Sequence, residues 1–176
     1  PVPAFSQNNP CAKSPMEVPG LTGVVAVAAG NRSSFAILAD GSVRSWGHND
    51  AGQLGDGTTA TRDSPVTVAG LAGITRISAG DRQALAMTAT GSLFAWGSNE
   101  WGMLLTGSAG PNQPSPVAVT TIGPVTAIYA GEVFSEALAA DGRVFFAGSY
   151  IPTPLTAPTV FFAPDLFPPA FVAEPA

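Results

Sequence analysis

Three stretches of the chain repeat one another at a nearly constant interval, and this repetition limits the fold more than any other feature. Each stretch begins with Ala-Gly, has a turn ending in glycine at its centre, and closes with another glycine. The copies are AGNRSSFAILADGSVRSWG, AGDRQALAMTATGSLFAWG and AGEVFSEALAADGRVFFAG, and their first glycines, Gly30, Gly80 and Gly131, are 50 and 51 residues apart. A period of about 50 residues built from short strands and turns predicts a propeller blade or a similar array.

The first copy shows why each stretch is expected to form a β-hairpin. Residues 34–38 are a short apolar run compatible with a strand, and residues 42–46 alternate between polar and apolar side chains. Asp40-Gly41 lies between them and is a strong two-residue turn, because glycine adopts a positive φ without steric cost. Gly47 ends the second run, and a glycine-rich surface loop is expected to follow.

The order of these residues resembles the regulator-of-chromosome-condensation repeat, in which AG-x-x-x-S-x-A-L-x-x-D-G-x-V-x-x-W-G-x-N-x-x-G-Q-L-G is followed by S-P-V. The first copy matches most fully, through Asp40-Gly41, Trp46-Gly47, Asn49, GQLG at 52–55 and SPV at 64–66. The second copy has GMLLTG where GQLGDG is expected, and the third copy has lost the tryptophan and the loop. The resemblance covers roughly residues 15–160. It implies an all-β propeller fold and is nearly silent about function.

We therefore predict an all-β fold, a partial propeller-like array of about three blades that forms an open arc rather than a closed seven-bladed ring. Propellers usually close with about 4 to 8 blades, and fewer blades leave sheet edges that aggregate unless they are covered. Residues 14–21 align with 64–71, so we expect them to be the closing strand of a blade whose earlier strands are not in this sequence. Three arrangements would cover the exposed sheet edges. The chain is part of a larger protein, it is an arc covered by its own tail or by another subunit, or it belongs to an oligomeric ring. We prefer an arc held in a larger assembly.

The predicted boundaries divide the chain into three parts. Residues 1–14 are an irregular lead-in, residues 15–163 are the repeat domain, and residues 164–176 are a tail rich in proline and aromatic residues. Proline prevents helix formation and is excluded from central strands. The aromatic side chains of the tail, which include Phe167 and Phe171, therefore either cap the array or dock onto a partner.

Inside the repeat domain, residues 24–28, 74–78 and 125–129 are expected to be the inner strands, because each runs into the Ala-Gly that starts a hairpin. Small residues gather there, as the crowded centre of a propeller requires. Trp46 and Trp96 are interpreted as core residues packed between neighbouring blades.

Charge and composition exclude several functions. The net charge is −5, and one lysine and six arginines are scattered along the chain. No basic stripe is present to neutralise phosphates, so nucleic acid is not expected as a partner. No apolar run reaches the roughly 18 residues needed to span a membrane. The Lys-poor composition, rich in Ala, Gly, Pro and Thr, suits a bacterial protein in an extracytoplasmic location, either periplasmic or secreted.

Motifs for catalysis, cofactors and metals are not found in the sequence. His48 is the only histidine, Cys11 is the only cysteine, and zinc sites need several such ligands. The sequence has no nucleophile elbow, no P-loop and no dinucleotide-binding fingerprint. We therefore expect no catalytic residue, no cofactor and no metal, and we interpret the chain as non-enzymatic.

The loop of the second copy supplies the candidate binding surface. Its large apolar side chains occupy a segment that should face solvent, and Trp and Met on loops are enriched at interface hot spots. Local loop packing is the alternative explanation. The candidate partner-binding residues are Trp101, Met103, Leu105, Glu100, His48, Phe167 and Phe171.

The sequence thus favours a protein–protein interaction module or structural subunit that docks onto a larger protein assembly through its loops and tail. The expected partners are other protein subunits, with a homo-oligomer as one arrangement. The alternative is a fragment of a full propeller that acts as an enzyme inhibitor or as a nucleotide-exchange-type regulator, both of which are activities implied by the resemblance.

Overall fold

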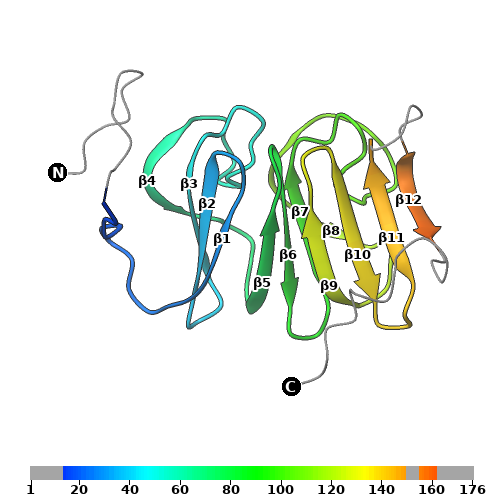
Figure 1. The fold of residues 1–176 in the computed structure, drawn as a ribbon, viewed down its shortest axis with the longest axis horizontal. Helices are drawn as coiled ribbons and strands as arrows, with labels where there is room; N and C mark the ends of the chain where they lie inside the picture. The colour runs from blue at the N-terminus through cyan, green and yellow to red at the C-terminus, as the bar shows by residue number, and fades with distance from the viewer. Residues whose placement is uncertain (1–13, 150–154, 162–176) are drawn as a thin grey trace.

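The structure is a computed structural model, and it describes residues 14–149 and 155–161. Within these residues, strands form three four-stranded antiparallel sheets that follow one another along the chain (Figure 1). We call the sheets blade 1 (β1–β4), blade 2 (β5–β8) and blade 3 (β9–β12). The strands are β1 Val24–Ala29, β2 Ser33–Leu38, β3 Val43–Gly47, β4 Arg62–Thr67, β5 Ile74–Ala79, β6 Gln83–Thr88, β7 Leu93–Gly97, β8 Gln113–Val119, β9 Val125–Ala130, β10 Phe134–Ala139, β11 Val144–Gly148 and β12 Leu155–Phe161.

The three blades form an open arc of propeller type. In every blade the strands pair in chain order, from the first to the fourth. The first strands of successive blades contact one another, β1 with β5 and β5 with β9, so these are the inner strands of the arc. The predicted all-β fold class and the predicted inner strands are confirmed.

The turn of the first hairpin also joins blade 1 to blade 2. Gly41 has a φ of 76°, and a Cβ atom there would lie 2.7 Å from the Cα atom of Gly73. The carbonyl of Gly41 accepts a hydrogen bond of 3.1 Å from the backbone N–H of Ile74, the first residue of β5. Glycine is required here both by the positive φ and by the close approach of the next blade.

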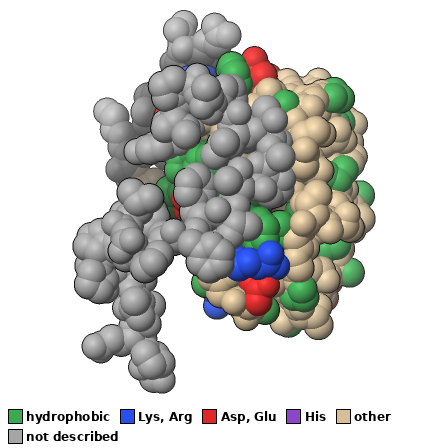
Figure 2. Space-filling view, turned by 90° about the vertical axis from the view of Figure 1, so that its right-hand side faces the viewer, with side chains coloured by type: hydrophobic (Ala, Val, Ile, Leu, Met, Phe, Trp, Pro, Cys, Tyr) green, Lys and Arg blue, Asp and Glu red, His purple; other side chains and the backbone are tan. Residues whose placement is uncertain are grey.

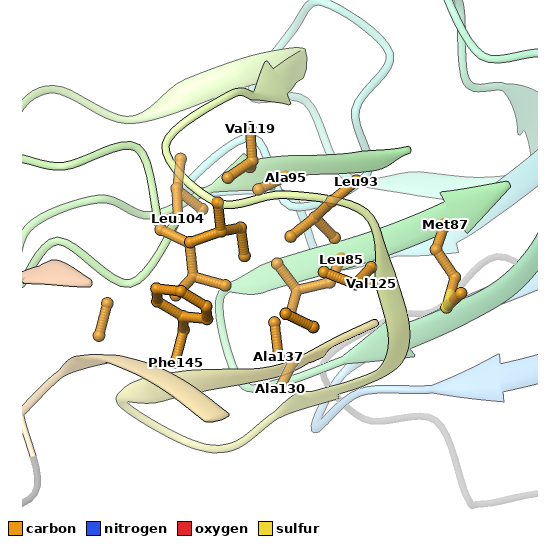
Figure 3. Close-up of a cluster of buried hydrophobic side chains, with 14 residues drawn as sticks. Leu85, Met87, Leu93, Ala95, Leu104, Val119, Val125, Ala130, Ala137 and Phe145 are labelled. Atoms are coloured by element: carbon orange, nitrogen blue, oxygen red, sulfur yellow. The ribbon is translucent and has the colours of Figure 1, made fainter. Parts of the chain in front are cut away.

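The core lies between the blades, in two apolar clusters. Successive side chains of a strand point to opposite faces of its sheet, and β6 shows this directly. Ala84 and Ala86 pack with residues of blade 1, whereas Leu85 and Met87 pack with residues of blade 3 (Figure 3). Blade 2 is therefore buried on both faces, and each outer blade is buried by another described blade on only one face.

The structure corrects one predicted strand. Residues 14–21 were expected to close a preceding blade, but they contain bends and turns and no strand, and most of them are exposed. A strand needs a neighbour to accept and donate its backbone hydrogen bonds, and none of the described residues before β1 forms a strand. The prediction was wrong for this segment because the repeat alignment assumed a sheet that these residues do not have.

The two tryptophans differ in burial, although their local sequences are alike. Trp96 is fully buried between blades 1 and 2, as predicted. Trp46 is only half-buried, so its predicted place in a core between blades is not what the structure shows. Trp96 faces blade 1, whereas no described blade lies on the equivalent side of Trp46.

The remaining boundaries stay predictions. Residues 1–13 of the predicted lead-in and all of the predicted tail lie outside the described residues. In the part of the chain that the structure describes, no helix is long and apolar enough to cross a membrane.

Candidate protein-binding surfaces

The long loops of blades 1 and 2 each follow the third strand of their blade, so both lie at the same end of the sheets. Each loop starts with a buried asparagine, Asn49 or Asn99, whose side-chain oxygen accepts a hydrogen bond from the backbone five residues later, at Leu54 (2.9 Å) or Leu104 (3.3 Å). The repeat therefore uses one polar side chain to fix the shape of each loop.

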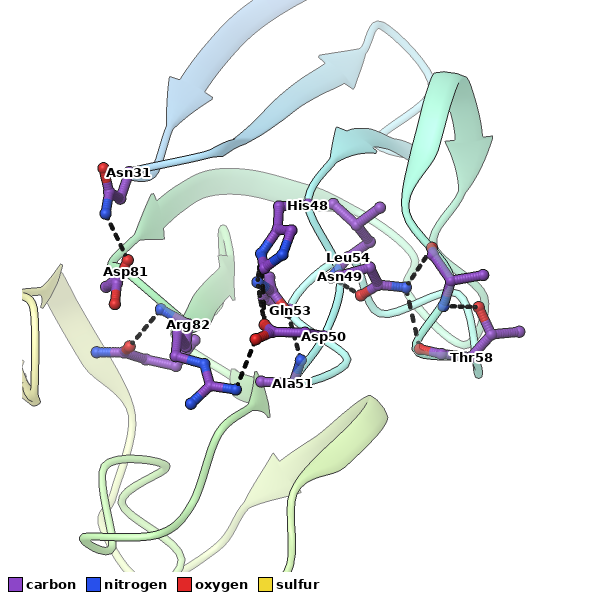
Figure 4. Close-up of polar contacts among 12 residues, drawn as sticks. Asn31, His48, Asn49, Asp50, Ala51, Gln53, Leu54, Thr58, Asp81 and Arg82 are labelled. Atoms are coloured by element: carbon purple, nitrogen blue, oxygen red, sulfur yellow. Dashed lines mark hydrogen bonds and ion pairs between the residues drawn. The ribbon is translucent and has the colours of Figure 1, made fainter. Parts of the chain in front are cut away.

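Asn49 makes the larger set of contacts (Figure 4). Its Nδ2 atom donates to the carbonyls of Thr58 and Ala60, both at 3.0 Å, and lies 3.2 Å from Oδ1 of Asp56. Burial raises the pKa of Asp56, but hydrogen bonds from Thr58 and Arg62 lower it by more, so the net pKa is below its ordinary value. The loop is thus a closed hydrogen-bonded unit and presents a fixed surface.

Replacing Asn49 with alanine is expected to lower the free energy of unfolding by about 2 to 4 kcal/mol, because each buried backbone group left without a partner costs about 1 to 3 kcal/mol. Urea unfolding monitored by circular dichroism measures the loss. Asn31→Ala is the matched control, since Asn31 is exposed and its side chain donates a hydrogen bond to the side chain of Asp81 rather than to a buried backbone group. Equal losses in the two variants would contradict this role of Asn49.

A second polar cluster joins the loop of blade 1 to the start of blade 2 (Figure 4). Oδ2 of Asp50 accepts a hydrogen bond of 2.9 Å from Nη2 of Arg82, and its Oδ1 lies 3.2 Å from Nε2 of Gln53 and 3.4 Å from Nδ1 of His48. Burial raises the pKa of Asp50, but the hydrogen bond from Gln53 and the charge of Arg82 outweigh it, so the net pKa is lowered. The cluster is partly exposed and links neighbouring blades electrostatically.

The predicted binding residues fall into three groups. Glu100 and Trp101 are exposed on the loop of blade 2, with Trp101 39% exposed, and His48 is half-buried in the loop of blade 1. Met103 and Leu105 are buried, at 3% and 0% exposure. Their assignment to a solvent-facing surface was wrong, because both side chains point into the protein. Phe167 and Phe171 lie outside the described residues.

The burial of Leu105 has a specific cause. Leu105 takes the place of Gly55 in the repeat, and in the first interface Gly55 leaves room for an indole: a Cβ atom there would lie 2.8 Å from Nε1 of Trp96. The third copy has Ala147 where the second has Trp96. Leu105 and Ala147 belong to the same buried cluster, so the leucine fills space that the missing indole vacates.

The backbone supports this equivalence. The φ of Gly55 is 72° and that of Leu105 is 60°, and Leu105 is the only non-glycine residue with a positive φ among those the structure describes. A branched side chain is rarely found in this region of φ. Sequence reasoning missed the exchange because its signal is a joint change in two copies, Gly to Leu in one loop and Trp to Ala in the next blade.

Comparisons with known proteins agree with this geometry. Residues 24–53 and residues 40–87 each match a family described as the regulator of chromosome condensation (RCC1) repeat. The chain carries RCC1-like repeats. The two matches together include the hairpin and loop of blade 1 and the first half of blade 2.

Individual RCC1-like relatives match over limited regions. The human E3 ubiquitin-protein ligase HERC2 is 49% identical over 49 residues, which are 27% of this chain and 1% of HERC2. Human WBSCR16 superposes with a TM-score of 0.68 and 26% identity, covering 78% of this chain and 37% of its own. Yeast RCC1 (Prp20), solved with Kap60, gives a TM-score of 0.70 and 22% identity over 80% of this chain and 37% of that chain, a likeness that shows the fold. The chain thus spans well under half the length of these relatives.

Proposed function

We propose that this chain is a non-enzymatic interaction module that docks, as a structural subunit, onto a larger protein assembly. The observation that carries the proposal is the open face of blade 1, the side of its sheet that points away from blade 2. Val24 and Val27 of β1 are 38% and 76% exposed there, whereas Ile74 and Val125, the equivalents of Val24 in the next two blades, are each 2% exposed. Apolar side chains gathered on an exposed face mark interaction sites.

The loop surface adds a second contact region. Trp101 stands exposed beside Glu100 at the rim of blade 2. Asn99 holds the backbone of this loop through hydrogen bonds with Leu104 and Ser108, so Trp101 is presented from an ordered segment. A preorganised aromatic side chain loses little conformational entropy on binding.

The relatives support a protein partner. One structure of the yeast relative holds it bound to Kap60, and another is reported together with its binding properties to Gsp1p and histones. Seen from the side of blade 3, the main patch of arginine side chains lies beside acidic ones (Figure 2). A net charge of −5 likewise disfavours a phosphate backbone as the ligand.

We infer binding rather than catalysis, and the described acidic groups bear on this inference. Within residues 14–149 and 155–161, no group of three His, Cys, Asp or Glu side chains is placed to hold a metal ion. The hollow where the starts of the three hairpins meet brings together Asp81 and Glu132, and Asp81 is bonded to Asn31 at 2.7 Å. These groups form a polar surface without a nucleophile beside a base.

The mass of the native protein, isolated gently from the cells that make it, tests this proposal. We expect a species heavier than the 17.7 kDa monomer, with other polypeptides in fixed ratio. Changing both Glu100 and Trp101 to alanine should weaken retention of the partner about 10-fold or more, as for an interface hot spot. Tyr129→Ala is the control, because Tyr129 is an exposed aromatic residue on an inner strand. A 17.7 kDa species without partners would contradict the proposal.

A further inference from the structure

The interface between blades 1 and 2 shows what this repeat needs from a preceding blade. Nε1 of Trp96 donates a hydrogen bond of 2.8 Å to the carbonyl of Gln53, in the loop of blade 1. The indole packs edge-on against Phe35, with the ring centroids 6.1 Å apart. Gly55 makes room for the indole, and Asp50 pairs with Arg82 at 2.9 Å. A following blade therefore uses its Trp and Arg, and the preceding blade supplies a glycine, a carbonyl and a carboxylate.

Blade 1 carries on its open face the Trp and Arg that a following blade directs toward the blade before it. Trp46 occupies the position of Trp96 and is half-buried, and Arg32 occupies the position of Arg82 and is exposed. The side chain of Arg32 makes no hydrogen bond or ion pair with the residues that the structure describes. Val24 and Val27 extend this face along the inner strand. The open face thus shares the Trp and Arg positions of the half-interface that blade 2 presents to blade 1, with Arg44 in the place of Phe94.

The two interfaces inside the chain combine a loop residue and a residue of the next blade in different sizes, and the members of the two pairs cannot be interchanged. One interface combines glycine in the loop with tryptophan in the next blade, and the other combines leucine with alanine. Leucine opposite tryptophan would put a branched side chain where a single Cβ atom already lies 2.8 Å from the indole. Glycine opposite alanine would leave a cavity. Close-packed interiors tolerate neither change without loss of stability.

We propose that the open face of blade 1 binds a blade of this same repeat type whose loop carries glycine at the Gly55 position and a carboxylate at the Asp50 position, and that it rejects a leucine loop. The pairing of Trp46 with glycine and of Arg32 with the carboxylate sets this preference. The inference rests on the proposed function, since it names the chemistry of one partner surface.

A second copy of this chain is a poorer occupant. The other end of its arc is blade 3, in which β11 ends at Gly148 and β12 begins at Leu155, compared with Gly47 and Arg62 in blade 1. The intervening sequence SYIPTP, residues 149–154, contains neither a glycine nor a carboxylate. Blade 3 also has Glu136 at the position of Phe35, so it would place a carboxylate against the indole of Trp46.

The chain supplies matched probes for this preference. In one extended protein, a copy of residues 24–73, which contains the glycine loop, is inserted directly before Val24 of the full chain. In the other, the insert is a copy of residues 74–124, which contains the leucine loop. Both proteins and the unextended chain used for comparison carry Trp101→Phe, and every tryptophan of the insert is changed to phenylalanine, so that Trp46 is the accessible tryptophan. Iodide quenching of fluorescence reports its exposure.

We expect the glycine-loop insert to shield Trp46 to the level of a fully buried indole, and the leucine-loop insert to leave it as open to quenching as in the unextended chain. Changing Gly55 of the first insert to Leu should restore quenching. Changing Arg32 of blade 1 in the full chain to Glu should weaken the shielding of Trp46 by the unmodified glycine-loop insert. Equal shielding by both inserts, or an accessible Trp46 beside a glycine-loop insert that circular dichroism shows to be folded, would overturn the proposal.

A second measurement covers the case in which an insert does not fold. Sedimentation of the unextended chain over a range of concentrations, with quenching measured on the same samples, tests a second copy as the occupant. Self-association that shields Trp46 would overturn the proposal, whereas a monomer with Trp46 accessible is the expected result. These measurements use the purified chain alone. A negative result would reject the preference of the open face but not the proposed binding through Trp101. The native mass of the protein tests that proposed function separately.

Discussion

Replacing Trp96 with alanine is expected to lower the free energy of unfolding by about 3 to 5 kcal/mol, the usual loss for a buried large aromatic side chain. The fully buried indole packs against Phe35, and its N–H donates to the carbonyl of Gln53. Removing it leaves a cavity between two blades and a buried carbonyl without its partner. Denaturant unfolding followed by far-ultraviolet circular dichroism measures this loss without relying on the deleted chromophore.

Trp46→Ala is the matched control, because Trp46 has the same place in the repeat and the same glycine after it. We expect a loss of about 1 kcal/mol or less, since much of the half-buried side chain is already in contact with water. The comparison holds residue type and position in the repeat constant and differs most in the described blade that lies against Trp96 and not against Trp46. Similar losses at both positions would show that burial against a neighbouring blade is not what stabilises Trp96.

This pair also shows how far the sequence alone can be read. The hairpins are local, because a turn such as Asp40-Gly41 depends on the φ that glycine allows and on flanking runs of strand-forming residues. The hairpins and inner strands were therefore predictable, whereas the strand expected at residues 14–21 does not form. Burial is not local, since Trp46 and Trp96 stand at the same position of the repeat and only Trp96 has a described blade across its interface.

The candidate site was predictable to the same limited degree. An apolar loop such as WGMLLTG indicates an unusual surface when it is read alone, and Trp101 is exposed, although its role in binding stays a prediction. It fails for Met103, which takes the position of the equally buried Gln53, and for Leu105, which lies in a buried cluster with Ala147 of the next repeat. Only a comparison of the loop with the following blade, where Ala147 replaces tryptophan, contains that information.

The exchange between Leu105 and Ala147 leads to the second large prediction. Ala147→Trp alone should lower the free energy of unfolding by about 3 kcal/mol, the upper part of the range for overpacking a close-packed core. Leu105→Gly alone should lower it by about 2 to 4 kcal/mol, because it opens a cavity, and relief of the positive φ offsets part of that loss. The double variant restores the glycine–tryptophan pair of the first interface, so its loss should be about 2 kcal/mol or more smaller than the sum of the two single losses.

A double-mutant cycle measured by urea unfolding tests this coupling. Leu105→Gly combined with Asn31→Ala is the control cycle, because Asn31 is exposed in blade 1 and its contribution should add to that of Leu105. Simple addition in the Leu105–Ala147 cycle would mean that the two positions do not share one space. Coupling limited to this pair would mean that the size of a loop residue is complementary to the size of the residue that the next blade packs against it. The same matching is what would allow the face around Trp46 to distinguish between partner blades.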